Sequence, residues 1–220
     1  MIFYKPNSIL KNRMSQQNIK DTIELLQLHY DFYLQIKPYA DKYEQPHPTD
    51  TRAWSQIVVS ALTGIQGLGR KKGSDFIDGS DVKAANCWDA IDTPRFNGCV
   101  KAGTKASSIN SLNIQPYLFF VMWDMVENTS QKRCRIWVVR TPNDTEFRAI
   151  AKKWYEQRES GQITSSNFQL HPPRNRDSNE FTNNCGNLKY PLFFEARISS
   201  GKYVVNSFDP DVLNEGLCSR

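Results

Sequence analysis

Two aspartates and a lysine occupy the polar segment Gly73-Ser-Asp-Phe-Ile-Asp-Gly-Ser-Asp-Val-Lys83. On a β-strand, successive side chains alternate in direction, so Asp81 and Lys83 would point to the same face with Val82 buried behind them. Asp75 supplies another carboxylate from the segment just upstream. The segment therefore predicts two carboxylates and one ammonium group that can act together.

This combination of groups suits metal-assisted cleavage of a phosphodiester bond. Two carboxylates and a main-chain carbonyl are the hard oxygen ligands that one or two Mg²⁺ ions prefer, and we expect Mn²⁺ to substitute. A metal held there would bind the scissile phosphate and lower the pKa of a bound water. The lysine would position that water or help to deprotonate it. This chemistry needs neither histidine nor cysteine, in agreement with only 3 histidines and 5 scattered cysteines.

The spacing of apolar residues predicts the elements that hold this site. Steps of three and four indicate helices at 19–43, 50–65 and 144–158. Runs of β-branched and aromatic residues between turn residues indicate strands, of which the first two form a tight hairpin. These strands are expected at 74–78, 80–85, 117–126, 133–139, 192–198 and 202–208. Helices, a mixed β core, a further helix and more strands predict an α/β or α+β domain.

The spacing Asp75…Asp81-Val-Lys83 resembles the PD-(D/E)XK nuclease superfamily, which is best known through type II restriction endonucleases. The resemblance implies a restriction-endonuclease-like core, with a mixed central β-sheet flanked by helices. It also implies Mg²⁺-dependent hydrolysis of double-stranded DNA at a specific short sequence. Carried over by motif, Asp81 and Lys83 are catalytic residues, and Asp75 and Asp81 are the metal ligands. The likeness extends to three further segments, residues 83–97, 171–176 and 183–189.

The segment departs from the superfamily pattern at two points. Ser74 stands where the pattern has a proline, and the spacing from Asp75 to Asp81 is shorter than in most members. Asp78 is therefore an alternative first acid, although an aspartate followed by glycine also suits the turn itself. Strand alternation in a regular hairpin favours Asp75. Glu24, on the first predicted helix, is a further candidate acid, as helical glutamates are in some members.

Basic and amide side chains elsewhere are candidates for DNA contacts. Arginine can pair with guanine, and asparagine with adenine, through two hydrogen bonds each. Residues 165–190 combine these types with few carboxylates and are predicted to form a long recognition loop, the alternative being an ordinary polar loop. Basic residues near the acidic segment suit phosphate contacts, the alternative being solvated surface charge. The candidates are Arg70, Lys71, Lys72, Arg95, Asn97, Lys105, His171, Arg174, Asn175, Arg176 and Asn183.

Length and composition limit the number of domains and the kinds of partner that we expect. A chain of 220 residues with 39% hydrophobic residues can bury one core, so we expect an N-terminal arm at 1–16 and a single domain at 17–220. The net charge of +5 permits a polyanionic partner without demanding one. Long apolar runs and a leader pattern are missing from the sequence, so we expect a cytoplasmic protein with reduced thiols and no membrane partner.

Cutting both strands of a symmetric DNA site requires two active sites, so a homodimer is expected, with the aromatics of the first helix as part of its interface. Two other functions stay open from the sequence. One is a DNA-binding module in which the acidic segment is only structural, and the other is a repair or nicking endonuclease of the same superfamily. Triplets of the D-X-K type are common by chance, so the prediction depends on the order of elements around the triplet.

Overall fold

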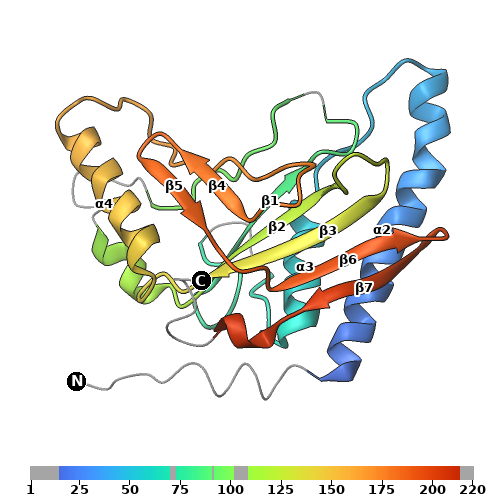
Figure 1. Ribbon diagram of the computed structural model, residues 1–220, viewed down its shortest axis with the longest axis horizontal. Coiled ribbons are helices and arrows are strands. Elements are labelled where there is room, and N and C mark those ends of the chain that lie inside the picture. Colours follow the sequence, from blue (N-terminus) through green and yellow to red (C-terminus); the bar gives the residue numbers. More distant parts are fainter. Residues whose placement is uncertain (1–14, 70–72, 91, 102–108, 214–220) are drawn as a thin grey trace.

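A five-stranded mixed β-sheet runs through the centre of the molecule, in the strand order β1-β2-β3-β6-β7 (Figure 1). The computed structural model describes residues 15–69, 73–90, 92–101 and 109–213. β1 is parallel to β2, and the other neighbouring pairs are antiparallel. β1 is therefore an edge strand. The strands are β1 (Asp81–Asn86), β2 (Leu118–Met125), β3 (Lys132–Val139), β6 (Phe194–Ser199) and β7 (Lys202–Phe208).

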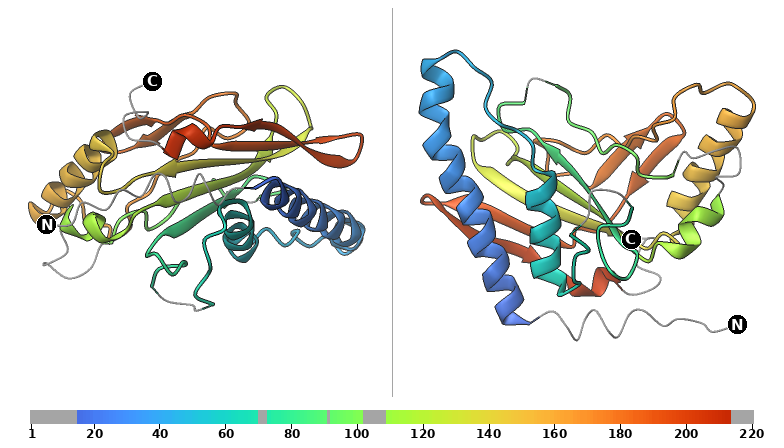
Figure 2. Two further views of the ribbon diagram at one scale, coloured as in Figure 1. Left: turned by 90° about the horizontal axis from the view of Figure 1, so that it is seen from below. Right: turned by 180° about the vertical axis from the view of Figure 1, so that it is seen from behind.

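Two helices, α2 (Gln16–Lys42) and α3 (Arg52–Thr63), cover one face of this sheet (Figure 2). α2 begins at a capping box, in which the Ser15 hydroxyl and the Asn18 amide satisfy each other's backbone groups. α3 ends at Gly64, whose φ of 69° is the left-handed conformation that commonly stops a helix. The predicted fold, a mixed sheet flanked by helices, is confirmed.

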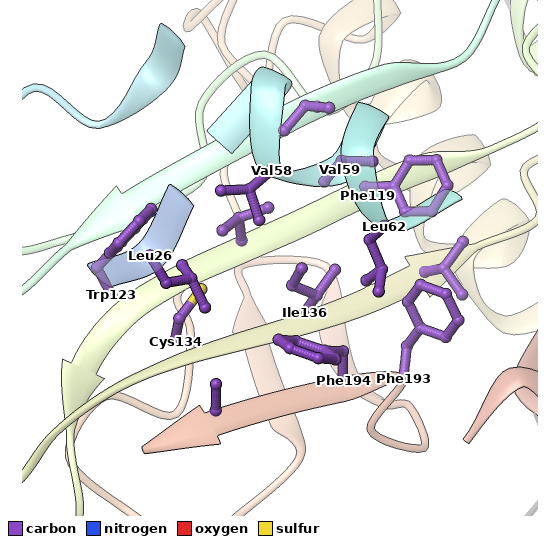
Figure 3. Close-up of a cluster of buried hydrophobic side chains, with 14 of the residues drawn as sticks. Leu26, Val58, Val59, Leu62, Phe119, Trp123, Cys134, Ile136, Phe193 and Phe194 are labelled. Atoms are coloured by element: carbon purple, nitrogen blue, oxygen red, sulfur yellow. The ribbon is translucent and has the colours of Figure 1, made fainter. Parts of the chain in front are cut away.

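The core between these helices and the sheet is built from alternate strand residues. Leu26 of α2 and Val58 and Leu62 of α3 are fully buried against the sheet. They meet Phe119 and Trp123 of β2, and Figure 3 shows these side chains facing one another between the layers. The burial of these apolar side chains is the main driving force that fixes the two helices on the sheet.

The opposite sheet face packs against α4 (Thr145–Glu159) and a small hairpin of β4 (Glu180–Asn183) and β5 (Gly186–Lys189). Phe181 of the hairpin makes an edge contact with Trp137 of β3, with ring centroids 5.0 Å apart. The prediction of one long loop at 165–190 was therefore wrong in its second half. The hairpin strands bury few apolar side chains and are rich in asparagine, so they lack the alternation that marks a strand. Short 3₁₀ helices, η1 (Ile109–Ile114) and η2 (Pro210–Leu213), complete the described elements.

The hairpin predicted around Gly79 was also wrong in its first strand. Residues 74–78 form a turn, apart from one isolated bridge between Phe76 and Gly67. The N–H groups of Asp75 and Phe76 both donate to the Ser80 carbonyl, which closes the chain too tightly for a ladder of strand pairs. Gly79 has a φ of +92°, and a Cβ there would lie 3.0 Å from the Ile114 carbonyl oxygen. The second predicted strand is β1.

Among the residues that the structure describes, no helix combines the length and apolar character needed to cross a membrane. Cys87, Cys99, Cys134 and Cys185 are free thiols.

Candidate active site

Asp81 and Lys83 lie side by side at the start of β1. The Lys83 ammonium donates to Asp81 Oδ2 over 2.8 Å, and the two side chains are only 21% and 20% exposed. Val82, between them, is buried in the core on the other face of the sheet. The strand register places Asp81 and Lys83 on the face that packs against α4 and the β4–β5 hairpin. Strand alternation thus produces the pairing that the sequence predicted.

Asp75 reaches the same place from the turn that precedes β1. Its Oδ2 accepts the N–H of Val82 over 2.8 Å, and its carboxyl group also hydrogen-bonds with that of Asp81. The Asp81 N–H donates to the Tyr117 carbonyl on the β2 side, so the following N–H, that of Val82, points to the open edge of the sheet. Asp75 therefore accepts a hydrogen bond at the edge of β1, where a neighbouring strand would otherwise pair. The turn at 74–78 lies where the sequence predicted the first strand of a hairpin.

Gln56 of α3 is a site residue that the sequence reasoning missed. Its Nε2 donates to Asp75 Oδ1 over 2.6 Å. Both carboxylate oxygens of Asp75 therefore have a defined donor, one from α3 and one from β1. The helix was predicted, but a glutamine on its partly exposed side gave no signal, because only the packing of α3 beside the turn brings it to Asp75.

The two carboxyl groups have opposite pKa shifts. Burial, together with the hydrogen bond to Asp81, raises the pKa of Asp75 to about 7. Burial also opposes the ionisation of Asp81, but the hydrogen bond with Asp75 and the charge of Lys83 outweigh it and lower the pKa of Asp81. The single positive charge of Lys83 does not balance two carboxylates, so ionising both Asp75 and Asp81 costs free energy.

The other two candidate acids lie elsewhere. Asp78 is exposed and closes the turn, where it accepts the N–H of Ser80 over 2.9 Å and the hydroxyl of the same residue. Glu24 lies on an exposed part of α2 and faces Lys20 at 4.0 Å. Neither shares the hydrogen bonds that join Asp75 to Asp81.

Carboxylates are suitable ligands for a hard divalent cation, and the Asp75–Asp81 pair matches that chemistry. The raised pKa of Asp75 is a separate sign of fit, because a cation at the pair would relieve the repulsion that retains the proton. Within the described ranges, no group of three or more His, Cys, Asp or Glu side chains is arranged to hold a metal. A cation at this pair would therefore complete its coordination with backbone, water or phosphate oxygens.

Two of the candidate DNA-contacting segments are joined next to the site. Arg95 and Asn97 are exposed, and the Phe96 backbone pairs with that of Leu170. Asn97 Oδ1 accepts the side-chain amide of Gln169 over 2.8 Å. These segments lie on the Asp81 and Lys83 face, because Phe96 and Leu170 pack in the same core cluster as Leu118 and Phe120, the register partners of Asp81 and Lys83.

Residues 173–178 form a loop whose carbonyl groups accept hydrogen bonds from two buried arginines of β3, Arg133 and Arg135. Arg135 donates to the carbonyls of Pro173, Arg176 and Ser178 over 2.7–3.0 Å. Asp124 pairs with Arg135 and also accepts the N–H of Asn175 over 2.9 Å.

The loop residues themselves divide into two kinds. The side chains of Arg174 and Arg176 are exposed, whereas Asn175 uses its own side-chain oxygen to accept the Met125 N–H. The hydrogen bond from Met125 at the end of β2 to Asn175 places this loop near the far end of β1, which runs parallel to β2. The exposed side chains of Arg174 and Arg176 are thus accessible to a partner, whereas the side chain of Asn175 has a structural role.

The remaining predicted contacts are placed differently. His171 pairs through its backbone with Thr182 of β4, and Asn183 closes the β4–β5 turn by accepting the Cys185 N–H over 2.7 Å. Four predicted basic residues lie outside the described residues, namely Arg70, Lys71, Lys72 and Lys105.

Comparison with known proteins adds an independent observation. Residues 38–205 match the family model described as MamI restriction endonuclease, and this range contains the whole Asp75, Asp81 and Lys83 cluster. The chain belongs to this family of restriction endonucleases.

A curated member from Microbacterium ammoniaphilum, described as type II restriction enzyme MamI, is 30% identical over 183 residues. The match covers 76% of this chain and 58% of that relative, so the chain spans less than two thirds of the relative's length. No solved structure matches this chain. Membership of the MamI family agrees with the predicted restriction-endonuclease resemblance.

Proposed function

We propose that this chain is a type II restriction endonuclease that hydrolyses double-stranded DNA at a specific short sequence with Mg²⁺ bound between Asp75 and Asp81. The observation that carries the proposal is the contact of two carboxyl groups and one ammonium group at the open edge of β1. Family membership supports the reaction class, and β1, which carries Asp81 and Lys83, is the edge strand of the described sheet.

Each side chain has a distinct role in this proposal. Asp75 and Asp81 bind the ion, which when bound polarises the scissile phosphate and lowers the pKa of a bound water. Lys83, held by Asp81, orients the attacking water and screens the charge that develops on phosphorus. Gln56 fixes the Asp75 carboxylate against α3, so the ligand geometry is set before DNA arrives.

DNA follows β1 in this proposal. Arg95 and Asn97 flank Phe96, which packs on the face of Asp81 and Lys83, while Arg174 lies in the loop near the far end of the strand. Arg174 and Arg176 suit contacts with phosphates or with guanine edges, because their guanidinium groups are exposed on an anchored loop. The target sequence depends on which of these side chains enters which groove.

Plasmid cleavage tests the site directly. We expect Lys83→Ala and Asp81→Asn to reduce the rate of cleavage in Mg²⁺ by about 100-fold or more, because each removes a group that acts on the reacting phosphate. Lys152→Ala is the matched control, since Lys152 is 68% exposed on α4. Thermal unfolding of each variant separates loss of chemistry from loss of fold.

Two results would redirect the proposal. Undiminished cleavage by Lys83→Ala would show that the site lies elsewhere. Duplex binding without cleavage in Mg²⁺ or Mn²⁺ would favour a DNA-binding module. Counting cuts on one duplex distinguishes a restriction enzyme, which breaks both strands, from a nicking enzyme of the same superfamily.

A further inference from the structure

Asn97 and Gln169 lie opposite each other on a two-stranded ribbon beside the candidate active site. The ribbon is set by Phe96 and Leu170, which exchange both backbone hydrogen bonds over 2.9 and 3.0 Å. In an antiparallel ribbon, the next cross-strand pair is therefore Asn97 with Gln169. The side chains of Phe96 and Leu170 are buried, so strand alternation turns the next pair to the outer face of the ribbon.

A chain of hydrogen bonds fixes the orientation of both side-chain amides. The Gly98 N–H can only donate, and it donates to Asn167 Oδ1 over 2.7 Å. The amide nitrogen of Asn167 is therefore free to face Asn97, and it donates to Asn97 Oδ1 over 3.0 Å. Gln169 Nε2 donates to the same oxygen over 2.8 Å. One backbone N–H thus sets which end of each amide is used inside the ribbon.

This chain of bonds leaves one donor and one acceptor for a partner. Asn97 Nδ2 and Gln169 Oε1 have no hydrogen-bond partner among the residues that the structure describes. Asn97 is exposed, and Gln169 is partly exposed. A donor beside an acceptor complements the major-groove edge of adenine, which presents the ring nitrogen N7 as an acceptor and the exocyclic amine as a donor. Guanine presents two acceptors there, and neither pyrimidine has N7.

The ribbon lies close to the catalytic strand. The Phe96 ring is 4.9 Å from that of Phe120, centroid to centroid, and Phe120 is the register partner of Lys83. A two-stranded ribbon is one of the shapes that the major groove admits. The side-chain amide of Asn183 donates to the Gln169 carbonyl, which ties the ribbon to the β4–β5 hairpin. The amide pair therefore starts from a supported backbone, which lowers the conformational cost of binding a base.

We infer that Asn97 and Gln169 together read one adenine of the target sequence, Asn97 by donating to N7 and Gln169 by accepting from the exocyclic amine. The inference rests on the proposed function, because it assigns a base contact within the DNA that the site would cut. Gln169 is thereby a specificity-determining residue, and Asn97 contacts a base rather than a phosphate.

Base analogues in the target sequence test the inference on the wild-type protein. The target is found by digesting a sequenced plasmid in Mg²⁺ and mapping the ends. Each adenine of the target is then replaced in turn by 7-deazaadenine, which lacks the N7 acceptor, or by purine, which lacks the exocyclic amine. We expect at least one adenine at which both analogues lower kcat/KM by about fivefold or more. A target without such an adenine would overturn the inference.

Two variants assign the contact to this pair. Asn97→Asp keeps the oxygen that accepts inside the ribbon and replaces only the donor, so it should no longer distinguish adenine from 7-deazaadenine. Gln169→Met removes the acceptor, so it should no longer distinguish adenine from purine. Asn143→Asp is the matched control, because it makes the same change at an exposed asparagine in the turn before α4, and it should keep both distinctions. An analogue effect that persists in its variant would assign the adenine to another residue and overturn the inference.

Cleavage and binding separate this inference from the proposed function. A wild type that cuts DNA at a target without such an adenine overturns the adenine contact and leaves the proposed activity standing. If the wild type cuts no DNA, the proposed activity fails, and the same analogues are placed in duplexes selected for binding from a random pool. A Kd raised by both analogues at one adenine then supports the inference, and any other result overturns it. A wild type that neither cuts nor binds DNA overturns both proposals.

Discussion

At the scale of single residues, the site depends on how each carboxylate oxygen is held. Asp81 is set by its strand and by Lys83, whereas Asp75 lies in a turn and depends on two external donors, Val82 N–H and Gln56 Nε2. A carboxylate in a turn has more freedom than one on a strand. In the proposed function, Gln56 is therefore a positioning residue, which would act on the reaction through Asp75.

Gln56→Met tests this role, because methionine keeps the length of the side chain and removes the donor. We expect the cleavage rate at saturating DNA to fall by about 10- to 100-fold and the Mg²⁺ concentration needed for half-maximal rate to rise. Gln56→Glu is expected to be worse than methionine, because it adds a third carboxylate. Gln17→Met, on an exposed part of α2, is the control. An unchanged Mg²⁺ requirement in Gln56→Met would argue against positioning.

At the scale of elements, the loop at 173–178 is anchored to the sheet by hydrogen bonds from Arg135 to its carbonyl groups. Arg133 and Arg135 of β3 are 1% and 2% exposed, and both pair with Asp124 of β2. Buried charges are tolerated only when they are paired and hydrogen-bonded, and here the loop carbonyls supply part of that requirement. The ion cluster and the loop therefore stabilise each other, and the exposed arginines start from a preorganised backbone.

Arg135→Lys tests this coupling. Lysine keeps the positive charge but cannot reach three carbonyls in the fork geometry of arginine. We expect faster amide hydrogen exchange at 173–178 and a several-fold higher KM for DNA, with little change in the rate at saturating DNA. The matched control is Arg158→Lys on α4, where the guanidinium stacks over Trp154. Equal protection of the loop in Arg135→Lys and wild type would contradict the coupling.

At the scale of the whole molecule, the packing of α2 on the sheet depends on an aromatic cluster that contains a histidine. The His29 ring lies 4.3 Å from Trp123 of β2 and 5.2 Å from Trp54 of α3, centroid to centroid. Within the described residues its Nδ1 has no hydrogen-bond partner. Burial, together with the nearby His47, lowers the pKa of His29 to about 4. The folded state therefore favours neutral His29.

This shift predicts acid sensitivity of the fold. A histidine with a lowered pKa stabilises the fold above its unfolded pKa of 6.5, and that contribution is lost as the pH falls from 6.5 towards 4. The expected loss is up to about 3 kcal/mol of unfolding free energy. His29→Phe should reduce this slope in urea unfolding at pH 7 and pH 4.5, whereas His171→Phe, outside the cluster, should not. A slope unaffected by His29→Phe would assign the acid sensitivity to other groups.

Local patterns were sufficient to predict much of this molecule. The buried face of α2, the turn-bounded strands β2, β3, β6 and β7, and the alternation that joins Asp81 to Lys83 all follow from periodicities of 3.6 and 2 residues. These features depend on neighbours along the chain, so the sequence carries them directly. The β4–β5 hairpin escaped prediction because its strands are short and polar, and Phe181, one of its few buried side chains, packs against a tryptophan far away in sequence.

The sequence alone determined that an acid and a lysine share a strand face in an α+β domain. Only the tertiary structure decided that Asp75 reaches them from a turn, that Gln56 holds it, and that Asp78 closes the turn instead. The physical reason is that strand alternation is a local rule, whereas the meeting of a turn, a helix and a sheet edge depends on how the layers pack.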